Sequence, residues 1–205
     1  MQQEKIINSD SNIANFNKTK ALVEGAAMLA LATVLGNIRI FKLPWGGAIT
    51  LFSMLPILIY SLRRGIKNGL CVSFLFSLIQ LFQGFIDGLL GWGLTPLMIF
   101  GVIFIDYIGA FTSLGLAGLF RKNKVSGNII GIIFAVLLRF VFHVLSGIII
   151  WHSFGQLWDG FYTTNEVLYS LVYNGAYMLP ELVITLIGAI ALMKLPKTRN
   201  LILNL

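Results

Sequence analysis

Five ionisable side chains stand inside long apolar runs of this chain: Glu24, Asp106, Arg139, His143 and Glu181. Charge is costly to bury in such runs, so groups of this kind mark either a structural pair or a site that handles charge. Asp106 is followed by Tyr107 and needs a partner, for which Arg139 and a cationic ligand are both candidates. We expect Glu24, near the end of its run, to be solvated or interfacial.

A second pattern repeats every four residues and comprises Arg139, His143, Gly147 and Trp151. Four helical residues turn by about 400°, so these positions share one broad face. The face presents a cation, an imidazole, a position without a side chain and an indole, and a flat group could lie in the gap at Gly147. The alternative is structural: Gly147 permits close helix packing and His143 bonds a neighbouring helix.

A third polar group begins the last apolar run with Tyr169, Tyr173, Asn174 and Tyr177. Such a face favours contact with a polar cavity over contact with lipid. Glu181 follows Pro180, and three roles stay open for it: capping the backbone freed by the proline, facing the cavity, or contacting a partner. Carboxylate, imidazole, amide and aromatic rings together suit a small flat cation, because aromatic faces attract cations.

The composition predicts the elements that position these groups. Of the 205 residues, 57% are hydrophobic and 11% charged, whereas soluble domains carry about 25% charged residues. This excludes a soluble globular domain and predicts an all-α integral membrane protein. The net charge of +7 lies in short loops, so it predicts topology and not nucleic-acid binding. Cys71 is the single cysteine, so neither an internal disulfide nor a cysteine-based metal site is expected.

Six transmembrane helices are predicted: Ala21–Ile40, Gly46–Leu62, Gly65–Phe85, Pro96–Phe120, Gly127–Trp151 and Val167–Leu195. Residues 1–20 are predicted to form a polar cytoplasmic segment, residues 21–195 a six-helix substrate-binding domain, and residues 196–205 a cytoplasmic tail. Twelve Lys and Arg fall in the segments of one side, and Arg39 and Lys42 alone fall on the other. This bias places both termini in the cytoplasm. The outer loops are rich in tryptophan, which favours a site that opens outward.

At four blocks the chain resembles the thiamine-specific S component of energy-coupling factor (ECF) vitamin transporters: Ser61–Gly65, Asp106–Arg121, Leu138–Trp151 and Tyr169–Met178. The resemblance covers nearly the whole chain after residue 20. It implies the S-component fold of six helices, in a multi-pass protein of the bacterial plasma membrane. It implies thiamine binding near the outer face, under the loop between the first two helices, with no catalysis and no cofactor.

The resemblance also implies which residues bind the ligand: Asp106, Tyr107, His143, Gly147, Trp151, Tyr169 and Asn174, with Trp45 nearest to a tryptophan of the first outer loop. Some family members have Glu in place of Asp106. A tyrosine that other members carry before the fourth helix has no counterpart near Pro96. Ala26 and Ala30 fit the family's small-residue pattern for docking on the transmembrane coupling subunit.

The residues bear on two further classes of function. An intramembrane protease is disfavoured, because the sequence lacks both a nucleophile turn and H-E-x-x-H. A proton-coupled secondary transporter of thiamine or a similar flat cation, with Asp106 or Glu181 as proton carrier, stays open. The resemblance implies a coupling subunit and two ATPase subunits as partners, and because the chain has no P-loop sequence, ATP hydrolysis would fall to those subunits. A phosphorylated ligand would need basic residues at the site, and only Arg139 is expected nearby.

Overall fold

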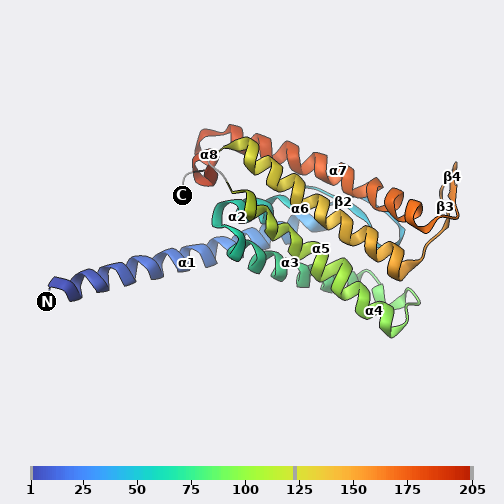
Figure 1. Cartoon of the computed structure of the whole chain (residues 1–205), viewed down its shortest axis with the longest axis horizontal. Helices are drawn as coiled ribbons and strands as arrows, with labels where there is room; N and C mark the ends of the chain where they lie inside the picture. The colour runs from blue at the N-terminus through green and yellow to red at the C-terminus, as the bar shows by residue number, and fades with distance from the viewer. Residues whose placement is uncertain (1, 122–123, 204–205) are drawn as a thin grey trace.

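The computed structural model describes the backbone of residues 2–121 and 124–203 and the side chains of residues 16–44, 46–121 and 124–202. It is a long helical bundle (Figure 1). Within the described residues, five helical stretches are long and apolar enough to cross a membrane: Phe16–Asn37, Ile66–Ile86, Pro96–Phe120, Val125–Trp151 and Glu166–Lys194. A mostly helical membrane protein is therefore confirmed, with five such stretches among the described residues in place of the predicted six.

The second predicted span, Gly46–Leu62, is wrong as a membrane-crossing helix. Its first residues form the end of a turn (η1, Pro44–Gly46) and a strand (β2, Ala48–Thr50), and the helix that follows, α2, covers only Leu55–Arg64. Ten residues span about 15 Å, half the apolar thickness of a bilayer. Residues 55–62 are all buried. The run is apolar because the helix lies in the protein core, not because it faces lipid.

The first helix, α1 (Gln2–Asn37), runs without a break through the predicted boundary at residue 20. The first predicted span should have continued to Ile40, but the helix ends at Asn37 and a strand follows, β1 (Arg39–Lys42). β1 pairs antiparallel with β2, with Arg39 opposite Thr50. We call residues 39–50 the first hairpin. A second hairpin, β3 (Gly155–Trp158) with β4 (Phe161–Thr163), precedes α7 (Glu166–Lys194).

Two spans contain wide helical turns, one around Asp106 and the other directly after Ser146. The fourth span consists of α4 (Pro96–Val102), the π-helical stretch η3 (Ile103–Gly109), α5 (Ala110–Thr112) and the 3-10 helix η4 (Ser113–Phe120). The fifth consists of α6 (Val125–Ser146) and a second π-helical stretch, η5 (Gly147–Trp151). Such π turns are frequent at functional sites, because they displace side chains from regular helical positions.

The bundle is closely packed at the end where α3 (Ile66–Ile86) begins. A Cβ added at Gly115 would lie 2.6 Å from the Leu70 Cα, and one at Gly118 would lie 2.7 Å from the Ile66 N. The backbones of α3 and η4 therefore touch, which side chains larger than glycine would prevent. This contact closes one half of the bundle and leaves the other half, toward the hairpins, for a cavity.

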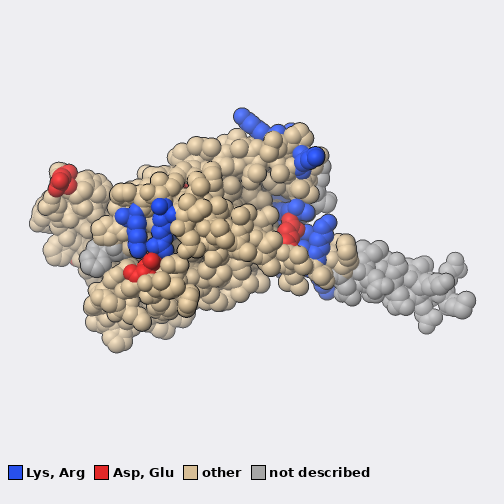
Figure 2. Space-filling view, turned by 180° about the vertical axis from the view of Figure 1, so that it is seen from behind, with Lys and Arg blue, Asp and Glu red and all other residues tan. Residues whose placement is uncertain are grey.

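The last helix, α8 (Pro196–Leu203), and the start of α1 lie at the same end of the bundle, and the second hairpin lies at the opposite end (Figure 1). The two ends of the chain thus lie on one side of the bundle, which agrees with the predicted topology. That this side faces the cytoplasm stays a prediction. On the face shown in Figure 2, charged side chains fall into two groups separated by a band of other residues. This distribution is typical of a membrane protein.

Candidate functional site

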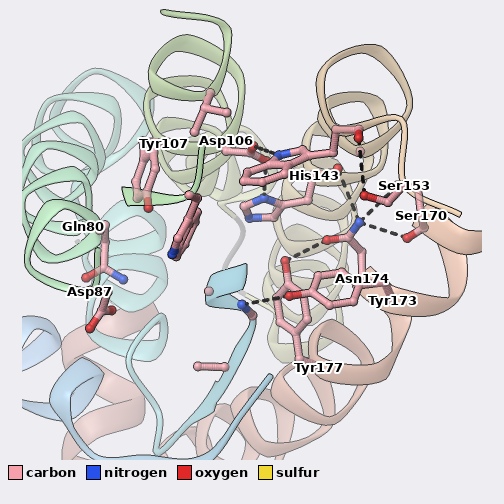
Figure 3. A pocket seen from close by; sticks show the side chains of 18 of the residues that line it. Gln80, Asp87, Asp106, Tyr107, His143, Ser153, Ser170, Tyr173, Asn174 and Tyr177 are labelled. Atoms are coloured by element: carbon pink, nitrogen blue, oxygen red, sulfur yellow. Dashed lines mark hydrogen bonds and ion pairs between the residues drawn. The ribbon is translucent and has the colours of Figure 1, made fainter. Parts of the chain in front are cut away.

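A cavity of about 580 Å³ lies in the half of the bundle nearer the hairpins (Figure 3). This volume is within the usual range for small-molecule sites. Its lining includes residues of the first hairpin, α3, the segment 92–94, α4, η3, α6, η5 and α7. Seven of the eight ligand-binding residues predicted from the sequence line it: Asp106, Tyr107, His143, Gly147, Trp151, Tyr169 and Asn174.

Asp106, on η3, forms three hydrogen bonds with one neighbouring span. Its Oδ1 lies 2.9 Å from the His143 Nδ1, the Ser146 hydroxyl donates to its Oδ2, and the Trp151 Nε1 donates to the same oxygen over 3.3 Å. Among the described residues, no Lys or Arg forms an ion pair with this carboxylate. The predicted alternative of an Asp106–Arg139 pair is wrong, because Arg139 pairs with Glu181, with 3.1 Å between Nη1 and Oε2.

His143 uses one ring nitrogen for Asp106 and leaves the other without a protein partner. Its Nε2 is buried and has no hydrogen bond to any described residue. The ring meets those of Phe111 and Tyr177 edge-on, each with centroids 6.1 Å away. An unpartnered buried nitrogen is costly. It marks His143 as a residue with hydrogen-bonding capacity left for a ligand.

Gly147 and Trp151 complete the same face. A Cβ at Gly147 would lie 2.1 Å from the Ser170 Oγ, so the glycine allows η5 and α7 to approach closely. The packing role predicted as an alternative for Gly147 is therefore present alongside its place in the cavity wall. The Trp151 ring lies 5.8 Å from that of Trp92, centroid to centroid, at an angle of 55°. Two indoles thus stand together in the wall.

The polar residues of α7 bond mainly to the protein itself. The Asn174 Nδ2 donates to the Ser170 carbonyl over 2.9 Å, and its Oδ1 accepts from the Tyr177 hydroxyl over 2.9 Å. Tyr169 and Tyr173 stack in parallel, with 6.4 Å between ring centroids. Asn174 therefore holds the Tyr177 side chain in place. The tyrosine rings of α7 form part of the cavity wall.

The first hairpin covers the cavity and is attached to α7. The Tyr173 hydroxyl accepts from the Gly47 N–H over 3.3 Å and donates to the Pro44 carbonyl. A Cβ at Gly47 would lie 2.8 Å from the Tyr177 ring, so only glycine permits this approach. The side chain of Trp45, the eighth predicted ligand-binding residue, lies outside the described residues, and its neighbours Gly46 and Gly47 line the cavity.

A family model described as "Thiamine transporter protein" matches residues 22–201 of the chain. The chain belongs to the thiamine transporter family. The thiamine transporter ThiT of Bacillus subtilis strain 168 is 33% identical over 177 residues, which are 80% of this chain and 84% of that protein. ThiT of Lacticaseibacillus paracasei is 28% identical over 148 residues, 66% of this chain and 68% of that protein. A solved structure of ThiT from Listeria monocytogenes superposes with a TM-score of 0.66 at 26% identity, covering 89% of this chain and 98% of that one.

Membership of the thiamine transporter family confirms the resemblance to thiamine-specific S components. Its bacterial relatives are named transporters and not enzymes. Together with the five apolar helical stretches, they make the chain a multi-pass bacterial membrane protein.

In this member of the thiamine transporter family, the cavity wall formed by α3 was not predicted from the sequence. Gln80 and Gln83 on α3 line the cavity, as do Asp87 and Arg39 at its mouth. Amides three residues apart in an apolar helix share a face, and that signal was available in the sequence. The expectation that Arg139 is the only basic residue near the site is also wrong, because Arg39 contributes to the lining.

Asp87 joins the first hairpin to the end of α3. Its carboxylate pairs with the Arg39 guanidinium at 2.7 Å and with the Lys42 ammonium at 3.3 Å. Burial favours the neutral acid, but the hydrogen bond and charge of Arg39, reinforced by Lys42, hold the pKa of Asp87 below its usual value. This ion-pair cluster ties the mouth of the cavity together on the side away from Asp106.

Two predictions concern residues far from the cavity. Ala26 and Ala30 lie on an exposed face of α1 and are not part of the cavity lining. Glu24 was predicted to be solvated or interfacial, and of these two alternatives the solvated one is wrong: Glu24 forms ion pairs with Arg63, at 2.9 Å, and with Arg64, and its side chain is 15% exposed. The reason is that the end of α2 brings both arginines against α1, which the sequence spacing does not reveal.

Proposed function

We propose that this chain is the high-affinity thiamine-binding subunit of an ECF-type importer. It captures thiamine at the outer face of the membrane and delivers it together with a coupling subunit and two ATPase subunits. The observation that carries the proposal is Asp106: a carboxylate in the wall of an aromatic-lined cavity, without a Lys or Arg partner among the described residues. A cationic ligand supplies the missing charge.

Thiamine combines a permanently charged thiazolium ring with an aminopyrimidine. The Asp106 carboxylate attracts the charge, and the faces of Trp151 and the paired Tyr169 and Tyr173 favour a flat cation, by about 2 kcal/mol where water is excluded. The unpartnered Nε2 of His143 provides one more hydrogen-bonding group for the ligand. Asp106, Tyr107, His143, Gly147, Trp151, Tyr169 and Asn174 remain the proposed binding residues, with Trp45 as the proposed cover from the first hairpin.

The proposed partners follow from what the chain lacks and what it exposes. Its sequence has no P-loop, so ATP hydrolysis belongs to other subunits. Ala26 and Ala30 lie one helical turn apart on an exposed face of α1, beside exposed Leu22 and Val34. Small residues at this spacing let another helix approach closely within a bilayer. This face is the proposed contact with the coupling subunit.

A thiamine titration of purified, ligand-free protein tests binding. Trp92 and Trp151 line the cavity, so tryptophan fluorescence reports occupancy. We expect saturable quenching at nanomolar thiamine. No quenching, in protein shown to be folded and ligand-free, contradicts the proposal.

Uptake into proteoliposomes tests the mechanism. We expect accumulation only when the coupling subunit, the ATPases and internal ATP are present. Accumulation by the chain alone, driven by a proton gradient, would instead support the secondary transporter.

A further inference from the structure

The Arg139–Glu181 pair has no role in the proposed recognition of thiamine, although both residues are buried beside the cavity. Their side chains are 8% and 2% exposed. A buried ion pair is weak evidence for stability, because desolvation offsets much of its attraction. Its contacts with the surrounding elements therefore decide what it does.

Glu181 uses its two carboxylate oxygens in two directions. Oε2 accepts from the Arg139 Nη1 on α6, over 3.1 Å. Oε1 accepts from the backbone N–H of Thr50 on β2, over 2.9 Å, and from the Thr50 hydroxyl. One carboxylate on α7 thus connects α6 to the end of the first hairpin.

Arg139 is itself fixed from other sides. Its Nη1 also meets the Met54 Sδ at 2.9 Å, and its guanidinium lies 4.2 Å from the centre of the Phe111 ring. These contacts hold the cation in one place, and the cation then orients the Glu181 carboxylate toward Thr50. The pair is arranged to position the hairpin, and Glu181 also offsets the positive charge of Arg139 beside the cavity.

The first hairpin is therefore attached to α7 at two points of different kind. Near its turn it is held by the neutral hydroxyl of Tyr173, which also lines the cavity. At its end it is held by the charged Glu181, eight residues further along α7, or about 12 Å. Hydrogen bonds to a charged acceptor are roughly twice as strong as neutral ones. The Glu181 attachment is the stronger of the two.

We infer that Arg139 and Glu181 are positioning residues: they fix the first hairpin over the cavity and thereby set how long the ligand stays bound. The inference rests on the proposed binding of thiamine. Arg139 and Glu181 thus hold the first hairpin, whereas other residues attract the thiamine cation.

Two variants of this contact test the inference. Glu181→Gln replaces one acceptor oxygen with a donor, so either Arg139 or the hairpin loses its bond. Thr50→Val removes the hydroxyl, which bonds both Glu181 and the Ser53 hydroxyl, and leaves both charges in place. We expect thiamine to dissociate at least about tenfold faster from Glu181→Gln and about three- to tenfold faster from Thr50→Val. Thr50→Ser keeps the hydroxyl and should restore the wild-type rate.

The matched control is Thr33→Val, since the Thr33 hydroxyl bonds within α1, to the Leu29 carbonyl at 2.8 Å, away from the cavity lining. Its dissociation rate should equal that of the wild type. Because Thr50 and Glu181 line the cavity, a direct ligand contact must be distinguished from positioning. Amide hydrogen exchange of residues 39–50 in ligand-free protein does this, since no ligand is present to be contacted.

Faster exchange of the first hairpin in ligand-free Thr50→Val and Glu181→Gln, with wild-type exchange in Thr33→Val, supports positioning. Unchanged exchange in Thr50→Val, or a wild-type dissociation rate in that variant, overturns it even if Glu181→Gln fails to fold. If the wild-type protein binds no thiamine, the proposed function fails, and hydrogen exchange alone then decides whether the pair positions the hairpin.

Discussion

The cavity wall contains two carboxylates deep in the helical bundle whose surroundings differ. Asp106 is hydrogen-bonded to His143, Ser146 and Trp151 and has no Lys or Arg partner among the described residues. Glu181 faces the Arg139 guanidinium and the backbone of the first hairpin. The charge of Glu181 is balanced by Arg139, whereas under the proposed function the charge of Asp106 is balanced by a cationic ligand. Burial alone does not separate a binding carboxylate from a structural one, but the charge of its partners does.

The largest expected effect is that of Asp106→Asn, which removes the charge and keeps the shape. We expect thiamine affinity to fall by roughly a hundredfold or more, the scale of a lost buried charge pair. Fluorescence titration measures it. Asp159→Asn is the matched control, because Asp159 lies at the second hairpin and outside the cavity lining. An Asp106→Asn affinity within threefold of wild type would remove the distinction between the two carboxylates.

The next effect is that of Trp151→Ala, which removes an aromatic face and one hydrogen-bond donor to Asp106. We expect affinity to fall about tenfold or more, from lost stacking and cation–π attraction. Trp158→Ala is the control, since Trp158 is half-exposed on β3 and does not line the cavity. Equal affinities of the two variants, measured by calorimetry, would show that ligand recognition does not extend from Asp106 to this ring.

Gly147→Ala tests whether thiamine binding on the Asp106 side of the cavity depends on the close packing of η5 against α7. The added Cβ would lie 2.1 Å from the Ser170 Oγ, so η5 and α7 must separate. We expect a loss of about 1–3 kcal/mol in stability, seen as a lower melting temperature in detergent, and weaker thiamine binding. Gly175→Ala is the control, because its Cβ would meet only the Leu179 Cδ1, at 3.9 Å. A wild-type melting temperature for Gly147→Ala would show that this contact relaxes freely.

The smallest effect is expected at the mouth, at Asp87. Its folded-state pKa lies below the unfolded value, so its ion pairs stabilise the protein above the unfolded pKa. That contribution is lost as pH falls through the lowered pKa. Asp87→Asn should therefore be less stable than wild type near neutral pH, by about 1 kcal/mol or less for each partly exposed pair. The difference should shrink in strongly acidic buffer.

Melting curves across pH measure this difference for Asp87. A constant difference between wild type and Asp87→Asn at every pH would contradict the ion-pair explanation.

The sequence predicted which residues line the cavity better than it predicted the contacts between them. Asp106, His143 and Trp151 stood out because polar and aromatic groups interrupt apolar helices, and all three line the cavity. The partner of Asp106 was left open, since spacing along one helix does not determine its rotation against another. The second span was misjudged because a buried strand and a buried short helix together resemble one apolar membrane helix. The ligand-binding roles of all eight residues stay predictions, and the side chain of Trp45 lies outside the described residues.

The π-helical turns at η3 and η5 determine which mutations this protein tolerates there. Each turn holds one more residue than a regular α-helix of the same rise. Deleting one residue there would let the turn rewind as a regular α-helix, which leaves the segments beyond it in place but turns side chains within the wide turn by up to about 100°. Asp106 and Trp151 would then lose their common orientation, although no side chain had been substituted. These two segments should therefore tolerate exchanges of apolar residues but not single-codon deletions.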